Sequence, residues 1–151
     1  LDKDKVILDG KCLYYFENDI KTNLMSQRFE WVSETDLAEI DNPIFQNIPH
    51  EEFADFMQII LNKKPYINLT KNVPESNFKD ILIDQNIVSI LIIPLFDKDT
   101  FLGFIGFDDC KTERIWTDEE NKDHQVLVFQ YHFVKNEIFP FFHHLVFLFH
   151  F

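Results

Sequence analysis

The side chains in this sequence that could take part in chemistry are few and widely spaced. The chain has two cysteines, Cys12 and Cys110, and they lie far apart. Two thiols cannot supply the four ligands of a structural zinc site. A disulfide and a pair of free thiols are both compatible with the sequence, and we expect free, buried thiols in a reducing compartment.

Acidic and histidine residues give no clearer sign of a reaction. Asp108 and Asp109 are adjacent at the end of a predicted strand, so their side chains should point to opposite sides of it. This favours a turn-stabilising role over a cation site or a regulatory acid. His143 and His144 lack the i, i+4 spacing with which two helical histidines share a metal ion. The sequence also lacks a glycine-rich phosphate loop and a nucleophile elbow, so it predicts no catalytic residue and no metal site.

The composition is that of a globular domain with an acidic surface. Of the 151 residues, 46% are hydrophobic and 26% are charged, with 18 phenylalanines and only 3 glycines. This length suits one domain with a sizeable core. The net charge of −12 should repel nucleic acid phosphates and anionic lipids, so we expect no nucleic-acid partner.

Signals for export or membrane insertion are not apparent. No charged-then-apolar segment opens the sequence, whose first residue is Leu1. The apolar run over residues 138–151 carries histidines and is shorter than the roughly 20 residues of a membrane span. We therefore expect a cytoplasmic protein with no membrane insertion.

The first half of the chain predicts a hairpin followed by a helix. Residues 11–17 and 24–32 are strand-like, and the polar residues 18–23 between them favour a turn. Over residues 24–32 we expect Met25, Gln27, Phe29 and Trp31 to share one face. Residues 49–64 predict a helix, because five apolar residues recur at helical spacing and Pro65 follows. These five are Phe53, Phe56, Met57, Ile60 and Leu61.

The second half predicts a short strand, a second helix and another hairpin. The strand covers residues 66–69, and the helix covers residues 74–86, with Asn86 able to cap its end. Residues 87–96 and 101–107 are apolar runs separated by a polar turn, which predicts two adjacent antiparallel strands with helices on both faces. The whole order is β-β-α-β-α-β-β-α, an α+β fold.

Several segments of the sequence match one known family in order. They are residues 89–94 (SILIIP), residues 103–109 (GFIGFDD), and Arg114-Ile115-Trp116 before the acidic capping box at residues 117–120. Upstream, residues 15–18 and 26–31 match its first hairpin. The chain therefore resembles a GAF domain of the kind attached to bacterial sensor histidine kinases and diguanylate cyclases.

The resemblance implies a GAF/PAS-like central antiparallel sheet of six strands, one more than the five predicted from the residues themselves. It covers residues 5–120, and the helix that normally opens a GAF domain has no counterpart in the few residues before Lys11. Residues 121–151 form an atypical tail rich in phenylalanine and histidine, which we interpret as a truncated or frame-shifted end.

GAF domains often hold a small ligand between one sheet face and the helices that cover it. Here the resemblance implies a cover from the two predicted helices and a floor from the second hairpin. The candidate pocket residues are Phe56, Ile60, Leu82, Ser89, Leu91, Ile93, Phe104, Gly106 and Asp108. The alternative is that these residues simply fill the core, which every such sheet requires.

The known ligands of the family do not fit this sequence, so the cofactor stays unassigned. The cyclic-nucleotide signature cannot be placed, and neither cysteine precedes a histidine as in bilin-binding members. His50 is a haem ligand candidate by residue type alone.

The resemblance implies a non-catalytic sensory domain of a two-component system. It would bind a small molecule or relay a signal through its terminal helices to an attached or partner kinase or cyclase. Two alternatives stay open. The chain is a degenerate GAF spacer that only dimerises, or it is a free methionine sulfoxide reductase using Cys110 with Cys12 as its partner.

Overall fold

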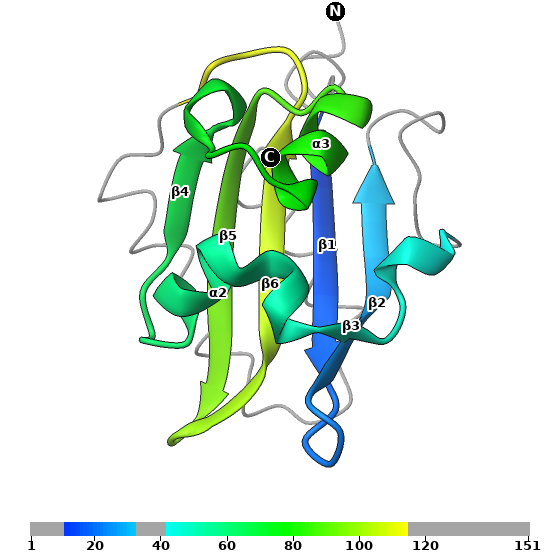
Figure 1. Cartoon of the computed structure of the whole chain (residues 1–151), viewed down its shortest axis with the longest axis vertical. Helices are drawn as coiled ribbons and strands as arrows, with labels where there is room; N and C mark the ends of the chain where they lie inside the picture. Colours follow the sequence, from blue (N-terminus) through cyan, green and yellow to red (C-terminus); the bar gives the residue numbers. More distant parts are fainter. Residues whose placement is uncertain (1–10, 33–41, 115–151) are drawn as a thin grey trace, which may run out of the picture.

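Six antiparallel strands form one sheet in this computed structural model, which describes residues 11–32 and 42–114. The spatial order is β3-β2-β1-β6-β5-β4, with both helices in front of the sheet in Figure 1. The strands are β1 (Lys11–Asn18), β2 (Leu24–Val32), β3 (Ile48–Pro49), β4 (Tyr66–Leu69), β5 (Ser89–Asp97) and β6 (Thr100–Asp109). The predicted α+β architecture is confirmed. The two-residue β3 is the strand that was not predicted from the residues themselves.

The β1–β2 hairpin forms where the sequence predicted it. The Asp19 carboxylate accepts hydrogen bonds from the backbone N–H groups of Lys21 and Thr22, at 2.8 and 3.3 Å. Asn23 then adopts a positive φ of 55°, a conformation that asparagine tolerates better than most residues. Local turn chemistry therefore defines this hairpin.

The β5–β6 hairpin is also confirmed. Asp97 pairs with Thr100, and Lys98 at the turn has a positive φ of 53°. The two strands run antiparallel and lie inside the sheet, with β1 on the other side of β6. The pairing of β1 with β6 brings the first and last strands of the described chain together. No local sequence pattern could specify this pairing.

The first predicted helix is shorter than expected. It begins as the 3₁₀ turn η3 (His50–Phe53) and continues as α2 (Ala54–Ile60). The non-helical backbone of Phe53 separates the two, and Leu61 is 41% exposed rather than part of the apolar stripe. The remaining four apolar residues are buried as predicted.

The second helix, α3 (Asn77–Asp84), is capped at both ends. The Ser76 hydroxyl accepts a hydrogen bond from the backbone N–H of Lys79 at 3.1 Å. Asn86, with a positive φ of 57°, ends the helical turn as predicted. Two further 3₁₀ turns, η2 (Pro43–Phe45) and η4 (Thr70–Asn72), connect the elements.

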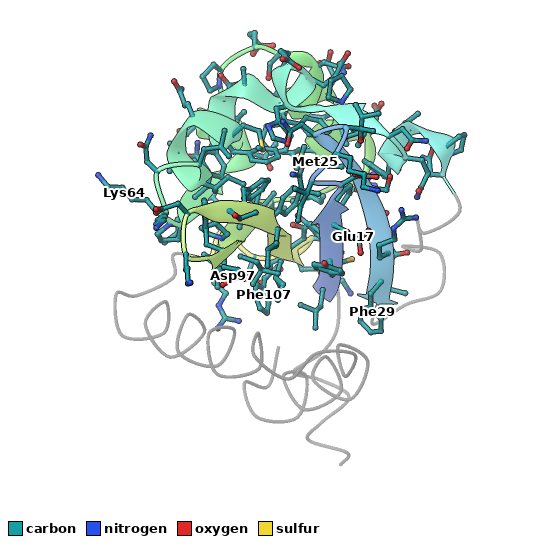
Figure 2. All side chains as sticks on the ribbon, turned by 90° about the horizontal axis from the view of Figure 1, so that it is seen from below. Glu17, Met25, Phe29, Lys64, Asp97 and Phe107 are labelled. Carbon is teal, nitrogen blue, oxygen red and sulfur yellow. The ribbon has the colours of Figure 1, made fainter. Side chains whose placement is uncertain are left out.

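The register of the sheet decides which side chains face the helices. Tyr14, Gly106 and Ile92 are directly paired and therefore share one face. Leu13, Phe107 and Leu91 are paired on the other face. Figure 2 shows Met25 on the helix side of the sheet and Phe107 on the far side.

A β-bulge interrupts the alternation of β2. Tyr15 pairs with Phe29, but the next residue, Phe16, pairs with Gln27. The extra residue turns Gln27 and Glu30 to the helix face, while Phe29 joins Tyr15 on the far face. The predicted grouping of Gln27 with Phe29 is therefore wrong.

The capping box at residues 117–120 and the tail at 121–151 lie outside the described residues. Among the residues that are described, no helix has the length and hydropathy that crossing a bilayer requires.

Candidate ligand cavity

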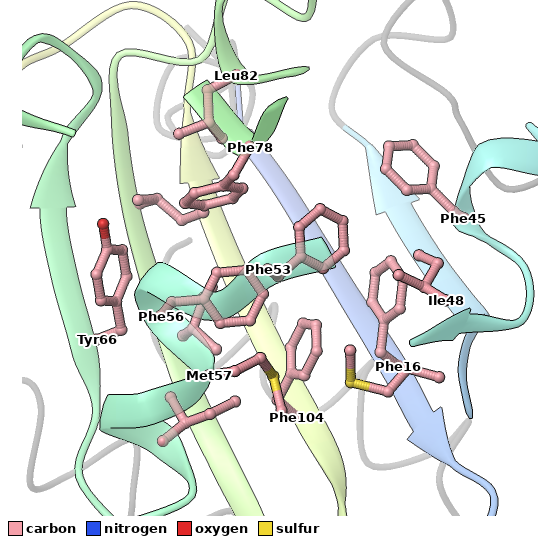
Figure 3. Close-up of a cluster of buried hydrophobic side chains, with 14 of the residues drawn as sticks. Phe16, Phe45, Ile48, Phe53, Phe56, Met57, Tyr66, Phe78, Leu82 and Phe104 are labelled. Carbon is pink, nitrogen blue, oxygen red and sulfur yellow. The ribbon is translucent and has the colours of Figure 1, made fainter. Parts of the chain in front are cut away.

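The helix face of the sheet carries an aromatic core, which we define as the six phenylalanine side chains that pack there around one cavity. Phe16 stacks on Phe104 with ring centroids 4.8 Å apart, and Phe56 meets Phe78 edge-on at 4.8 Å. Phe53 lies over these rings from η3, as Figure 3 shows. The aromatic core comprises Phe16, Phe45, Phe53, Phe56, Phe78 and Phe104.

A cavity of about 60 Å³ lies between this aromatic core and a polar end formed by β1, β2 and β6. Its polar lining side chains are Cys12, Tyr14, Gln27, Glu30, Gln85 and Asp108, and its further apolar ones are Ile81, Leu82, Ile87, Ile90 and Ile92. By comparison, an apolar cavity of about 150 Å³ accepts benzene, so this cavity suits a smaller ligand.

The structure brings only part of the predicted pocket together. Phe56, Leu82, Phe104 and Asp108 line the cavity. Ile60 is fully buried beside Phe56 in the same apolar core but does not line the cavity.

Three predicted floor residues lie on the wrong face of the sheet. Ser89, Leu91 and Ile93 alternate with Ile90 and Ile92, and only the last two reach the cavity. The prediction assumed that the odd-numbered residues of β5 share a face with the even-numbered residues of β6. The observed register pairs even positions with even ones, so the assignment was one residue out.

Ser89 has a structural role on the far face. Its hydroxyl donates to the carbonyl oxygen of Thr112 at 2.8 Å and accepts from the backbone N–H of Arg114 at 3.1 Å. The neighbouring Asp109 carboxylate accepts from the N–H groups of Lys111 and Thr112, both at 2.9 Å. These bonds hold the turn that follows β6, as predicted for one member of the acidic pair.

Gly106 makes room for the ring of Tyr14. A Cβ atom at this position would lie 2.0 Å from Cε2 of that ring. Tyr14 therefore lies across the strand, and its hydroxyl donates to Oδ1 of Asp108 at 2.9 Å. The glycine is covered by an aromatic ring and does not line the cavity, so its predicted place in the pocket is wrong.

Asp108 is the buried carboxyl of the cavity, with an exposed fraction of 3%. Burial raises its pKa well above the usual value, and the hydrogen bond from Tyr14 opposes this only partly. Burial likewise raises the pKa of the Tyr14 hydroxyl, as does the neighbouring carboxylate. The two adjacent acids therefore lie in different environments: Asp108 lines the cavity, whereas Asp109 holds a turn.

Cys12 and Cys110 meet at the same end of the sheet, and neither forms a disulfide. The hydrogen bond between them, and then burial, raise the pKa of the Cys12 thiol. The Cys110 thiol also contacts the backbone oxygen of Gln85 at 3.9 Å. A raised pKa disfavours the thiolate, the form that acts as a nucleophile.

Gln27 contributes the most unusual polar group of the cavity. Its side chain is 95% buried, since only 5% of the residue is exposed. Its Oε1 atom has no hydrogen-bond partner within the described ranges, residues 11–32 and 42–114. Buried amide oxygens are nearly always paired, so this one is a sign of a missing donor.

Five polar lining residues were not predicted: Cys12, Tyr14, Gln27, Glu30 and Gln85. The first four belong to β1 and β2, which were not considered as part of the floor. Alternation along β1 would have grouped Cys12, Tyr14 and Phe16, but only the β1–β6 pairing shows that this group faces the helices.

His50 does not reach the cavity. Its Nε2 atom is 2.8 Å from Oδ1 of Asn18, and its ring meets Phe101 edge-on at 5.7 Å. Burial lowers the pKa of this imidazole. Over the described part of the chain, no three His, Cys, Asp or Glu side chains are grouped to hold a metal ion.

Comparison with known proteins gives one sequence relative. The chain is 42% identical over 132 residues to the methanogenesis regulatory histidine kinase FilI of Methanothrix harundinacea. The match covers 79% of this chain but only 15% of the kinase, so the chain spans a small part of that protein. No family model matches the chain.

Solved structures share the fold at low sequence identity. A phycocyanobilin-bound GAF domain from a cyanobacterial phytochrome has a TM-score of 0.66 at 14% identity, over 82% of this chain and 73% of that one. The GAF domain of a two-component sensor histidine kinase from Bacillus halodurans has a TM-score of 0.63 at 15% identity, over 84% of this chain and 82% of that one. Together, these similarities give the chain the fold of GAF domains and a sequence relative among regulatory histidine kinases.

Proposed function

We propose that this GAF domain is a sensory module that holds a small ligand in the cavity and relays its presence to a histidine kinase output. The observation that carries the proposal is the buried Oε1 of Gln27, which has no hydrogen-bond partner among the described residues and belongs to a side chain that lines a cavity with an apolar and a polar end. Concave sites with a few converging polar groups on an apolar wall are typical of ligand sites. The related regulatory kinase supports an output of this class.

The relay requires that the ligand distinguish two conformations. A ligand shifts an equilibrium only by the difference between its affinities for the two states. The helices α2 and α3 contribute the cavity wall through Phe56, Ile81 and Leu82. A ligand that fits one placement of these helices better than another would therefore change the population of that placement.

Filling the cavity tests the proposal. Ile81 is half-buried on α3 and lines the cavity, whereas Ile83 on the same helix is 53% exposed. We expect Ile81→Phe to remove a bound small molecule and Ile83→Phe to retain it. The measurement is native mass spectrometry of the purified chain, with thermal melting to show that both variants are folded.

The competing function is a dimerising spacer with a filled core. In that case native mass spectrometry would show the unliganded chain, and no compound in a metabolite screen would raise the melting temperature. The orphaned Gln27 oxygen favours the sensor, because a core that serves only packing gains nothing from an unsatisfied acceptor.

The reductase alternative receives less support. Cys12 and Cys110 do lie together, but the raised pKa of the Cys12 thiol disfavours its ionised form. Loss of methionine sulfoxide turnover in a Cys110→Ser variant would establish it, and we expect no turnover in the parent chain.

A further inference from the structure

We propose that the cavity selects a compact organic cation, a protonated amine on a branched apolar body. This inference rests on the proposed sensory function and names the class of ligand that the same cavity takes. Four features of the described residues support it: the polar lining includes several acceptors, no lining side chain is basic, the aromatic core offers ring faces, and the volume is small.

The polar end of the cavity is rich in hydrogen-bond acceptors. The Gln27 Oε1 atom needs a donor, and the carboxyl groups of Asp108 and Glu30 accept when ionised. The hydroxyl of Tyr14 donates to Asp108 and is thus engaged within the protein. A ligand with several N–H groups matches this arrangement, whereas a ligand with only acceptors does not.

The lining of the cavity contains acidic groups but no basic ones. Among its lining residues within the described chain there is no Lys, Arg or His, while Asp108 and Glu30 are both acidic. The C-terminal half of α3 supplies Ile81 and Leu82, and Gln85 follows the helix. The C-terminal end of a helix carries partial negative charge, so α3 adds to the attraction for a cation.

Burial of Asp108 makes this end of the cavity respond differently to a cation and to an anion. The pKa of this carboxyl is raised mainly because its charged form is poorly solvated. A positive charge beside it would stabilise the ionised form, since an opposite charge within a few ångströms favours ionisation. An anionic ligand would instead add a second negative charge to a site with no basic lining residue.

The aromatic core suits a cation that also has an apolar surface. Ring faces attract positive charge, and the rings of Phe16 and Phe104 are stacked on the floor while Phe53 and Phe56 cover it. The cavity volume near 60 Å³ is well below the about 150 Å³ of an apolar cavity that accepts benzene, so the apolar part of the cation must be small.

The inference is tested with three probes of similar shape and different charge. They are tert-butylammonium, neutral tert-butyl alcohol and anionic isobutyrate, titrated into the 151-residue chain by calorimetry. Tetramethylammonium, a cation without N–H donors, is the fourth probe. We expect tert-butylammonium to bind at least about tenfold more tightly than the alcohol, because hydrogen bonds to a charged group are worth more than neutral ones. Tetramethylammonium should bind between these two, and isobutyrate should not bind.

Variants of the acceptors identify the site. We expect Glu30→Gln to weaken tert-butylammonium binding about tenfold and Glu17→Gln, an exposed control on β1, to leave it unchanged. Gln27→Leu should raise the melting temperature of the ligand-free chain, because it removes an unsatisfied buried oxygen, and should weaken binding of the same probe. A purely structural role for Gln27 would not produce this opposition.

The outcomes separate this inference from the proposed function. If the neutral or anionic probe binds as tightly as the ammonium, the cation preference is overturned and the sensory function stands. If no probe binds, the outcome depends on the small molecule that native mass spectrometry detects. A molecule without a basic nitrogen overturns the inference, and a molecule that has a basic nitrogen supports it. If no small molecule is present either, both proposals fail together.

Discussion

At the scale of single residues, the polar end of the cavity depends on one contact between neighbouring strands. Tyr14 lies over Gly106, and this position brings its hydroxyl to Asp108. A side chain at residue 106 would displace the ring, and the carboxyl would then lose its donor. Because Gly106 has no side chain, the Tyr14 hydroxyl can reach the carboxyl group of Asp108.

Gly106→Val tests this contact. We expect it to destabilise the chain by about 1–3 kcal/mol, because the added methyl groups overlap the Tyr14 ring. Chemical denaturation of the two single variants and of the double variant with Tyr14→Ala measures the coupling. The double variant should lose at least about 0.5 kcal/mol less than the sum of the singles. Additive losses would show that the ring and the glycine do not interact.

Asp108→Asn tests the buried carboxyl through the pH dependence of stability. In the folded chain the pKa of Asp108 is raised above its ordinary value of 3.8, so the folded state binds a proton that the unfolded state has released. Stability should therefore fall as pH rises from about 4 through the raised pKa, and this fall should be smaller in the variant. The titratable groups that act on Asp108 are Cys12, Tyr14, Glu30, Asp109 and Cys110.

The measurement is the urea midpoint at several pH values between about 4 and 8. Asp97→Asn, an exposed carboxyl on β5, is the matched control and should keep the slope of the parent. Parallel curves for the Asp108 variant and the parent would show that the buried carboxyl does not carry the linkage.

At the scale of elements, an irregularity in β2 and a short helix complete the cavity. The β-bulge turns Gln27 and Glu30 to the same face, although an unbroken strand would place them on opposite faces. On the other side, α3 brings Ile81 and Leu82 to the wall. The bulge therefore adds acceptors, and the helix adds apolar cover.

Ser76→Ala tests how firmly α3 is anchored. The hydroxyl of Ser76 caps the helix, so its loss should destabilise the chain by about 0.5–2 kcal/mol. Glu75→Ala is the control, because the exposed ion pair of Glu75 with Lys79 should contribute less than about 0.5 kcal/mol. Denaturation midpoints of the two variants decide the comparison. Equal effects would show that the cap is not what holds the first turn.

At the scale of the whole molecule, the sheet separates two environments. The helix face holds the aromatic core and the cavity, and the far face buries Leu13, Leu91 and Phe107. The match to a regulatory histidine kinase covers only 15% of that protein, so this chain corresponds to one segment of that kinase. In the proposed function, the helix face would respond to the ligand, and the connection to the output would lie elsewhere.

The sequence by itself determined the types and order of the main elements. Asp19 and Asn23 define the first turn through local interactions. The apolar stripe of α2 and the end of α3 at Asn86 are likewise set by neighbouring residues in the sequence. Resemblance to the GAF family added the sixth strand, which is too short to give a periodic signal. Four of the residues proposed for the pocket, Phe56, Leu82, Phe104 and Asp108, line the same cavity.

Only the tertiary structure decided which faces meet. The pairing of β1 with β6 brings Tyr14 to Gly106 and Asp108, and the bulge in β2 adds Glu30. Ser89 was assigned to the wrong face because a shift of one residue in register exchanges the two sides of a strand. Strand pairing and register depend on contacts between residues far apart in the chain, so the local sequence does not indicate them.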